Sequence, residues 1–273
     1  MADHPVVACS RGPDSAEAVR LGAQLAAAVG QPLLIASAYR YEPVVLTPGV
    51  IATSSNALRY DVAEARVDEA VRSVPAAVEA RGEIVPAQDV PRALVDLAHE
   101  ADACALVVGG DVESDVTRKL LEHAPCPLVV ATSGSAPVAD EPPRMLGVAW
   151  DGSPGARCAL HAAIQLAGHS GAQIRIISVG SGIDTQAAAA RLPDASEADI
   201  RRLGGHPGER LAAASAELDL LLCGTHSRGR VAAAVLGSVS AHLLEAARCP
   251  VLVIPPRARP RAKGPLGLTT AAE

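Results

Sequence analysis

The stretch GTHSRGRVAAAVLGS, residues 224–238, combines three glycines with hydroxyl side chains and follows the apolar run LDLLLC. Small residues let main-chain N–H groups approach a phosphate, and a helix that begins near Gly237 and Ser238 would direct its positive end at the same anion. Ser238 and Ser240 add hydroxyl donors. The stretch therefore predicts an anion-binding loop. A tight loop without a ligand is the alternative, because one Gly-rich loop is weak evidence.

Asp151 lies in a second candidate loop, DGS, which follows the apolar segment GVAW. Its carboxylate could bind a donor of a ribose or a base, or a Mg²⁺ carried by phosphates. It could equally end a strand and cap the following helix, with Ser153 at the N-cap and Pro154 at the first helical position. Both interpretations stay open here. Trp150, the one tryptophan of the chain, precedes Asp151, and we expect it to pack in the core rather than stack on a base.

The composition excludes nucleic acid as an expected partner. With 273 residues, 49% of them hydrophobic, the chain can form one large domain or two. Only 1% of the residues are aromatic, which leaves no platform for base stacking. The net charge of −6 also lacks the basic surface that binds a phosphate backbone.

Other sequence features predict a cytoplasmic protein without a membrane span. The segment MADHPVVACS carries Asp and His where a signal peptide would carry Lys or Arg before a long apolar stretch. No uninterrupted apolar run approaches the roughly 18 to 20 residues that cross a bilayer. The six cysteines are scattered through apolar segments without the close pairs of a zinc site. We expect buried free thiols and no metal site of the protein's own.

Three sequence blocks occur twice in the same order, which indicates two copies of one unit. They are LLEHAPCPLVVAT (120–132) with LLEAARCPVLVIP (243–255), VVACSRGPDSAEAVRLGAQLA (6–26) with GVAWDGSPGARCALHAAIQLA (147–167), and DACALVVGG (102–110) with ELDLLLCGT (217–225). The expected division is a first domain at 1–132, a linker at 133–144, a second domain at 145–256 and a disordered tail at 257–273.

Each copy alternates fully apolar runs with segments of helical periodicity, the pattern of a parallel sheet covered on both faces. In the first copy we expect strands near 5–9, 33–38, 77–85, 104–109 and 127–131, and helices near 14–28, 56–73, 90–100 and 114–123. The predicted fold class is α/β: two tandem doubly wound, Rossmann-like domains, each with a five-stranded parallel sheet. A site in such a fold lies at the carboxyl ends of the strands. We interpret GGHPGERL, 204–211, only as a turn before a helix.

The second copy resembles the universal stress protein family, whose members have an adenine nucleotide α-hydrolase-like fold. The resemblance rests on VAWDGS, on GTHSRG followed by LGSV, and on RCPVLV. The family's nucleotide motif is Gly, two residues, Gly, nine residues, Gly, then Ser or Thr. Gly224, Ser227, Gly237 and Ser238 occupy these four positions with the spacing intact, and Ser227 replaces a glycine.

The resemblance implies an ATP site in the second copy. Asp151 would contact the adenosine part, and could also contact nucleotide-bound magnesium, while the backbone of Val179 would meet the adenine. The residues expected around the ribose and phosphates are Gly224, His226, Ser227, Gly237, Ser238, Val239 and Ser240. At Ser227 a Cβ would weaken binding if the backbone needs a positive φ, whereas its hydroxyl could donate to a phosphate.

The first copy departs from the motif, so we expect no nucleotide there and favour a scaffold or dimer-mimic role. Ser10 stands where the family has Asp, and Arg11 and Gly12 replace the Gly-Ser that follows. The phosphate loop is eight residues shorter than in the second copy and is effectively absent. It carries Asp111, Glu113 and Asp115, whose negative charges would repel phosphates.

Three classes of function follow. The favoured one is a stress or signalling protein whose ATP occupancy biases contacts with an unidentified protein partner, without catalytic residues. At most we expect weak ATP hydrolysis, or autophosphorylation at Ser238 or Ser240. The alternative is a nucleotide-independent scaffold or dimerisation protein. Least favoured is an adenine-nucleotide-using enzyme, because no nucleophile with a base is evident. The resemblance suggests that the copies pair through their last strands, within one chain or in a homodimer.

Overall fold

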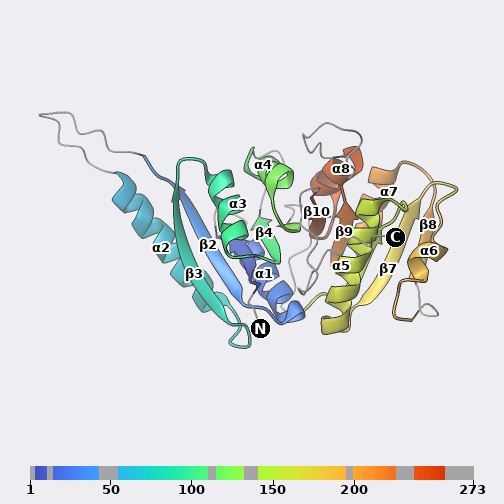
Figure 1. The fold of residues 1–273 in the computed structure, drawn as a ribbon, viewed down its shortest axis with the longest axis horizontal. Coiled ribbons are helices and arrows are strands. Elements are labelled where there is room, and N and C mark those ends of the chain that lie inside the picture. The colour runs from blue at the N-terminus through green and yellow to red at the C-terminus, as the bar shows by residue number, and fades with distance from the viewer. Residues whose placement is uncertain are drawn as a thin grey trace, which may run out of the picture.

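The computed structural model describes residues 4–10, 15–42, 55–109, 115–131, 141–194, 199–225 and 237–255. Strands and helices alternate along them (Figure 1). The first half contains β1 (Val6–Cys9), α1 (Ser15–Val29), β2 (Leu33–Arg40), α2 (Ser55–Ser73), β3 (Ala80–Ala87), α3 (Val90–Glu100), β4 (Ala105–Gly109), α4 (Asp115–His123) and β5 (Leu128–Ala131). The second half contains β6 (Met145–Ala149), α5 (Pro154–Ser170), β7 (Gln173–Val179), α6 (Gln186–Ala189), β8 (Asp199–Leu203), α7 (Pro207–Ala214), the 3₁₀ turn η2 (Ser215–Glu217), β9 (Leu220–Gly224), α8 (Ser238–Ala246) and β10 (Val251–Ile254).

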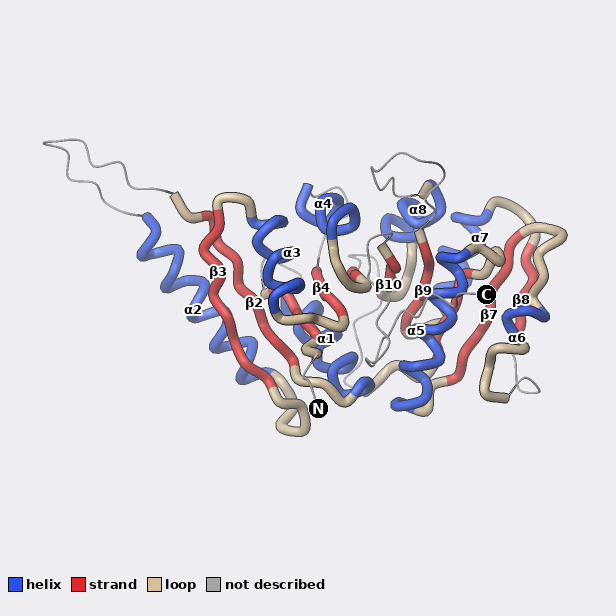
Figure 2. Tube along the Cα trace, viewed as in Figure 1, coloured by secondary structure: helices blue, strands red, loops and turns tan. Residues whose placement is uncertain are grey.

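The strands form one ten-stranded sheet in the order β3-β2-β1-β4-β5-β10-β9-β6-β7-β8. Within each half all neighbouring strands are parallel, which confirms the predicted fold class of two doubly wound, five-stranded sheets. The halves join where β5 and β10 pair antiparallel, with Val251 opposite Val130 and Val253 opposite Leu128. The tube in Figure 2 shows the two halves side by side around this junction.

Helices cover both faces of the sheet because the strands alternate apolar side chains between the faces. In β1, Val6 and Ala8 pack on the side of α1 and α5, whereas Val7 and Cys9 pack on the side of α3, α4, α7 and α8. Helices α1 and α5 also contact each other. A single layer of helices therefore spans both halves on that side of the sheet.

Strand β3 begins at Ala80, three residues later than expected, because Pro75 and Val78 form a turn in which the Val78 N–H donates to the Pro75 carbonyl at 2.9 Å. The predicted linker lies mostly outside the described residues, and the predicted tail lies entirely outside them. Of the helices described, none is long and apolar enough to cross a membrane.

Candidate functional site

A cavity of about 590 Å³ opens in the second half, at the carboxyl ends of β6, β7 and β9. Helices α7 and α8 and the turn into α5 complete its walls. The lining residues are Ala149, Trp150, Asp151, Ser153, Ala156, Ile177, Val179, Pro207, Leu211, Cys223, Gly224, Gly237, Ser238, Val239 and Ser240. Strand β6 lies between β9 and β7, so the cavity occupies the point where the chain changes direction across the sheet, the usual ligand position in this class of fold.

Seven of the nine residues predicted from the sequence line this cavity. They are Asp151, Val179, Gly224, Gly237, Ser238, Val239 and Ser240. The other two, His226 and Ser227, lie outside the described residues. The structure thus brings together positions that lie up to about ninety residues apart in the chain.

Asp151 shapes the turn between β6 and α5. Its Oδ1 accepts the N–H of Ser153 at 2.9 Å, while Ser153 Oγ accepts the N–H of Ala156 at 3.1 Å and caps the helix. Between them Gly152 has a φ of +79°, which a glycine adopts without strain. Ser153 therefore fills the capping role, and Asp151 orders the turn with an exposed carboxylate at the rim of the cavity.

Gly224, at the end of β9, packs back to back with Gly155 in the first turn of α5. A Cβ on Gly224 would overlap the backbone of Gly155, and a Cβ on Gly155 would lie 2.8 Å from the Thr225 carbonyl oxygen. A side chain at either position would force the backbone apart. Close packing of helix on strand is thus a reason for glycine at 224 that the sequence did not reveal.

Gly237, the N-cap of α8, has free space around it, in contrast to the closely packed Gly224. Its φ is −63°, a value open to any residue, and a Cβ built on it meets no described atom within 4 Å. Without a side chain it gives no side-chain cap to the first-turn N–H groups of α8. The helix therefore presents N–H groups and its positive dipole end at the cavity, beside the exposed Ser238.

An apolar wall faces this helix terminus. Ile177 and Val179 alternate along β7, and Pro207 and Leu211 lie one helical turn apart on α7. Ile177, Pro207 and Leu211 were not predicted from the sequence, although the period of two in the strand and the spacing of four in the helix are signals for such a wall. The interpretation of GGHPGERL as a turn only was incomplete, because Pro207 begins α7 and lines the cavity.

Trp150 packs in the core, as expected, and also reaches the cavity. It is 3% exposed, and its Nε1 donates to the Asp184 carbonyl at 2.9 Å. The ring is held by this hydrogen bond while one part of it lines the cavity. It is therefore positioned to report on ligand binding by fluorescence.

Cys223 and Ser240 form the floor of the cavity. Ser240 is 4% exposed, and the Cys223 thiol lies 4.0 Å from its hydroxyl oxygen. Burial raises the pKa of the Cys223 thiol to about 12, so it stays protonated and is a poor nucleophile at neutral pH.

Five of the six free cysteines are buried as expected, but Cys158 is only half-buried. Within the described ranges, no three His, Cys, Asp or Glu side chains cluster in a way that could hold a metal ion.

In the first half of the chain, Ser10 occupies the position that corresponds to Asp151 in the second half. This residue is 3% exposed, and its carbonyl accepts a hydrogen bond from the Ser37 hydroxyl at 3.3 Å. A buried neutral side chain thus replaces the exposed carboxylate of Asp151. The residues Arg11, Gly12, Asp111 and Glu113, and the side chain of Asp115, lie outside the description that the structure gives.

The fold defines a tandem, doubly wound α/β protein, and the cavity lies at the carboxyl ends of the strands of its second half. Comparison with protein families matches residues 183–255 to the universal stress protein family. A universal stress protein of Mycobacterium tuberculosis is 29% identical over 288 residues, which cover 91% of this chain and 95% of the relative. Together these matches support membership of the universal stress protein family.

Solved structures agree with this fold. A universal stress protein of Archaeoglobus fulgidus superposes with a TM-score of 0.73 at 18% identity, covering 92% of this chain and 96% of its own. A further universal stress protein of that organism has been solved in complex with dAMP. It covers 48% of this chain and 98% of its own, at 20% identity and a TM-score of 0.39.

Proposed function

We propose that the second half binds an adenine nucleotide, ATP in particular, and that the protein acts in a stress response or in signalling by nucleotide-biased contacts with other proteins. The observation that carries the proposal is the cavity itself. An apolar wall faces a helix N-terminus whose cap, Gly237, has open space where every other residue type would place a side chain. A base with attached phosphates has the same division into an apolar ring and an anion.

The base would lie against β7 and α7. Ile177, Val179, Pro207 and Leu211 supply the apolar surface. The Trp150 N–H donates to the Ile177 carbonyl at 2.8 Å, so the main chain of Ile177 faces β6. The main-chain N–H and C=O groups of successive residues in a strand point to opposite sides, so every second residue points the same way. The main-chain groups of Val179 therefore point to the same side as those of Ile177, at a level beyond the end of β6. This placement supports main-chain recognition of the adenine by Val179.

The phosphates would lie at the start of α8. The N–H groups of its first turn and the hydroxyl of Ser238 are suited to donate hydrogen bonds to them, and the missing side chain of Gly237 leaves room for close approach. Asp151, which also lines the cavity, is suited to the ribose hydroxyls or to a Mg²⁺ carried by the nucleotide. Gly224 contributes by packing α5 against β9, which fixes the position of Asp151.

We propose a binding protein rather than an enzyme, with at most weak ATP hydrolysis or autophosphorylation. Ser238 is exposed and suits a phosphoryl acceptor better than Ser240, which is 4% exposed. The Cys223 thiol, whose pKa burial raises to about 12, is an unsuitable nucleophile. The cytoplasmic location expected from the sequence remains a prediction.

Titration with Mg²⁺ and ATP, followed by Trp150 fluorescence, tests the proposal. We expect a saturable change with ATP, a weaker response to adenosine, which lacks the phosphates, and a weaker response to inorganic triphosphate, which lacks the base. Ser227→Gly should bind ATP more tightly than the natural chain. No response at millimolar ATP, together with no nucleotide in the purified protein by mass spectrometry, would reject nucleotide binding and favour the nucleotide-independent scaffold.

A further inference from the structure

Strand β3 ends the ten-stranded sheet, and its outer side carries main-chain groups directed away from β2. The Leu33 N–H donates to the Glu79 carbonyl and the Tyr41 N–H to the Ala87 carbonyl, both at 2.8 Å. Odd-numbered residues of this segment therefore face β2. Because neighbouring residues of a strand direct their main-chain groups to opposite sides, the even-numbered residues 80, 82, 84 and 86 face outward.

The position of Pro86 agrees with this assignment. Proline has no N–H, and it is tolerated in a sheet where that missing donor would face away from the neighbouring strand. Ala80, Gly82 and Ile84 thus present three outward N–H groups and three outward carbonyls, before Pro86 interrupts the series. The edge is a short template that another strand could pair with.

We propose that two copies of this chain associate through β3, antiparallel and centred on Gly82. In this register Gly82 of one copy lies opposite Gly82 of the other, and Ala80 lies opposite Ile84. Every outward N–H and carbonyl from Ala80 to Ile84 then has a partner. Centring the pair on Ile84 instead would place Pro86 opposite Gly82. Because proline has no N–H, the Gly82 carbonyl would then lack a hydrogen-bond donor.

The charges along β3 match the same two-fold register. Between the hydrogen-bonded pairs, Arg81 of one copy lies opposite Glu83 of the other, and the reverse pair is identical by symmetry. Such intervening pairs bring Cα atoms to about 4.5 Å, and opposite charges there are stabilising. Arg81 is exposed and Glu83 half-buried, and neither has an ion-pair partner among the residues that the structure describes. A second copy supplies both partners.

The surface beside β3 has room for this partner. A groove of about 770 Å³ lies between α2 and the strand, and its lining residues are Tyr60, Glu64, Val67, Asp68, Val71, Arg72, Gly82, Glu83 and Ile84. Tyr60 is 43% exposed. A neighbouring copy would reduce the exposure of this ring.

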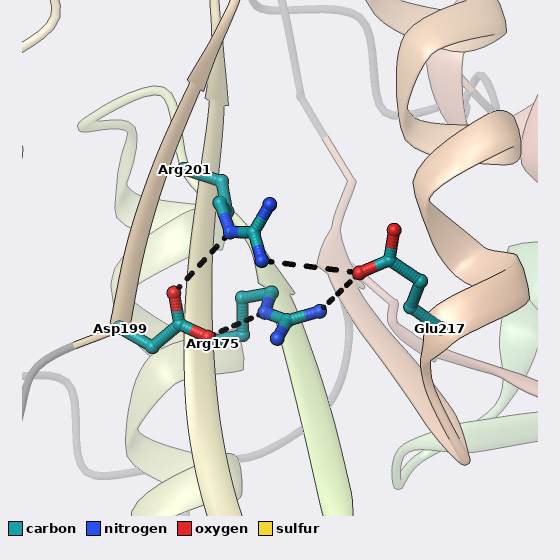
Figure 3. Close-up of polar contacts among 4 residues, drawn as sticks. All are labelled: Arg175, Asp199, Arg201 and Glu217. Carbon is teal, nitrogen blue, oxygen red and sulfur yellow. Dashed lines mark hydrogen bonds and ion pairs between the residues drawn. The ribbon is translucent and has the colours of Figure 1, made fainter.

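The charges at the opposite edge of the sheet, β8, are arranged differently. Arg175 donates from Nε to Asp199 at 2.6 Å and from Nη1 to Glu217 at 2.9 Å, and Arg201 also approaches both carboxylates (Figure 3). Arg175 and Arg201 are therefore ion-paired within the chain, and the exposed Arg202 of the same strand donates to the Thr185 hydroxyl. Arg81 and Glu83 on β3 have no such ion pairs among the described residues.

Light scattering of the full chain after size-exclusion chromatography, over a dilution series, tests the proposal. The natural chain should approach twice the chain mass of 27.7 kDa as concentration rises. Arg81→Glu and Glu83→Arg each turn both attractive pairs into repulsive ones, so each variant alone should associate roughly tenfold more weakly or worse. An equal mixture should recover dimers, because the two carboxylates of the first variant then face the two guanidinium groups of the second.

Recovery on mixing separates an interface effect from a folding defect. Arg92→Glu, which reverses an exposed charge on α3 that pairs with Asp96 and is not part of the proposed strand pair, is the matched control and should associate like the natural chain. Hydrogen exchange should show concentration-dependent protection of the Gly82 and Ile84 amides. A monomeric natural chain at all concentrations would overturn the proposal and make the edge charges a guard against pairing. Dimers that persist in both variants, without protection at Gly82, would place the contact elsewhere.

Discussion

Gly155→Ala should destabilise the protein and displace the turn that carries Asp151. The added Cβ would lie 2.8 Å from the Thr225 carbonyl oxygen and 3.2 Å from Gly224 Cα. Both neighbours are backbone atoms of β9 and its extension, so no side chain can rotate away to make room. The first turn of α5 must move instead, and Ser153 and Asp151 move with it.

The magnitude follows from overpacking at a helix–strand contact. Forcing one methyl group into a filled contact costs about 1 to 3 kcal/mol. Urea unfolding at 25 °C, followed in parallel by Trp150 fluorescence and circular dichroism, measures this free energy. The same variant should bind ATP more weakly, because the turn at one rim of the cavity has shifted.

Gly168→Ala is the matched control, because it makes the same chemical change in the same helix. A Cβ on Gly168 meets nothing within 4 Å, and the residue is exposed. Alanine there should stabilise the protein by about 0.5 to 1 kcal/mol through helix propensity and a less flexible unfolded chain. If Gly155→Ala raised the stability as Gly168→Ala does, the argument for back-to-back packing would be refuted.

Three further variants test other parts of the structure. Ser153→Ala removes the N-cap of α5 and should lower the free energy of unfolding by about 1 kcal/mol, measured by urea unfolding. Arg175→Leu should cost about 1 to 2 kcal/mol, because it removes the short ion pairs and leaves Asp199 and Glu217 only the longer contacts with Arg201, at 3.5 and 3.9 Å, and the loss should shrink in high salt. In the native protein at pH 8, Cys158 should react first with a thiol reagent, since burial raises the pKa of Cys9 and Cys223 to about 12 and lowers their thiolate fraction. Mass mapping that found Cys9 or Cys223 modified before Cys158 would contradict this order.

The fold could be predicted from sequence because its signals are local and repeated. Apolar runs separated by helical periodicity gave the parallel sheet, and the recurrence of the Cys-Pro strand, with LVV at 128–130 and VLV at 251–253, gave its duplication. The start of β3 was misplaced because residues Val74, Pro75 and Val78 continue the apolar composition of the strand although they form a turn.

The site could be predicted only in part. Val179 ends β7 and Asp151 lies two residues after the end of β6. The carboxyl ends of parallel strands lie at one edge of a sheet, so the sequence could place both residues there. The part of the apolar wall that α7 supplies was not predicted, because the sequence around Pro207 and Leu211 does not indicate which cavity these residues line. The role of Gly155 was missed for the same reason: its contact with Gly224 joins positions about seventy residues apart, and only the packed structure brings them together.

The phosphate end of the proposed site is tested most directly by comparing ATP affinities of Gly237→Asn and Gly237→Asp. Both side chains are good N-caps and find open space, so both variants should fold at least as stably as the natural chain. A carboxylate about 4 to 5 Å from a phosphate costs about 3 to 4 kcal/mol at an effective dielectric constant of 20. Calorimetric titration should therefore show binding at least tenfold weaker for Gly237→Asp than for Gly237→Asn. Equal affinities of the two variants would contradict the account, because the phosphates could not then lie at the start of α8.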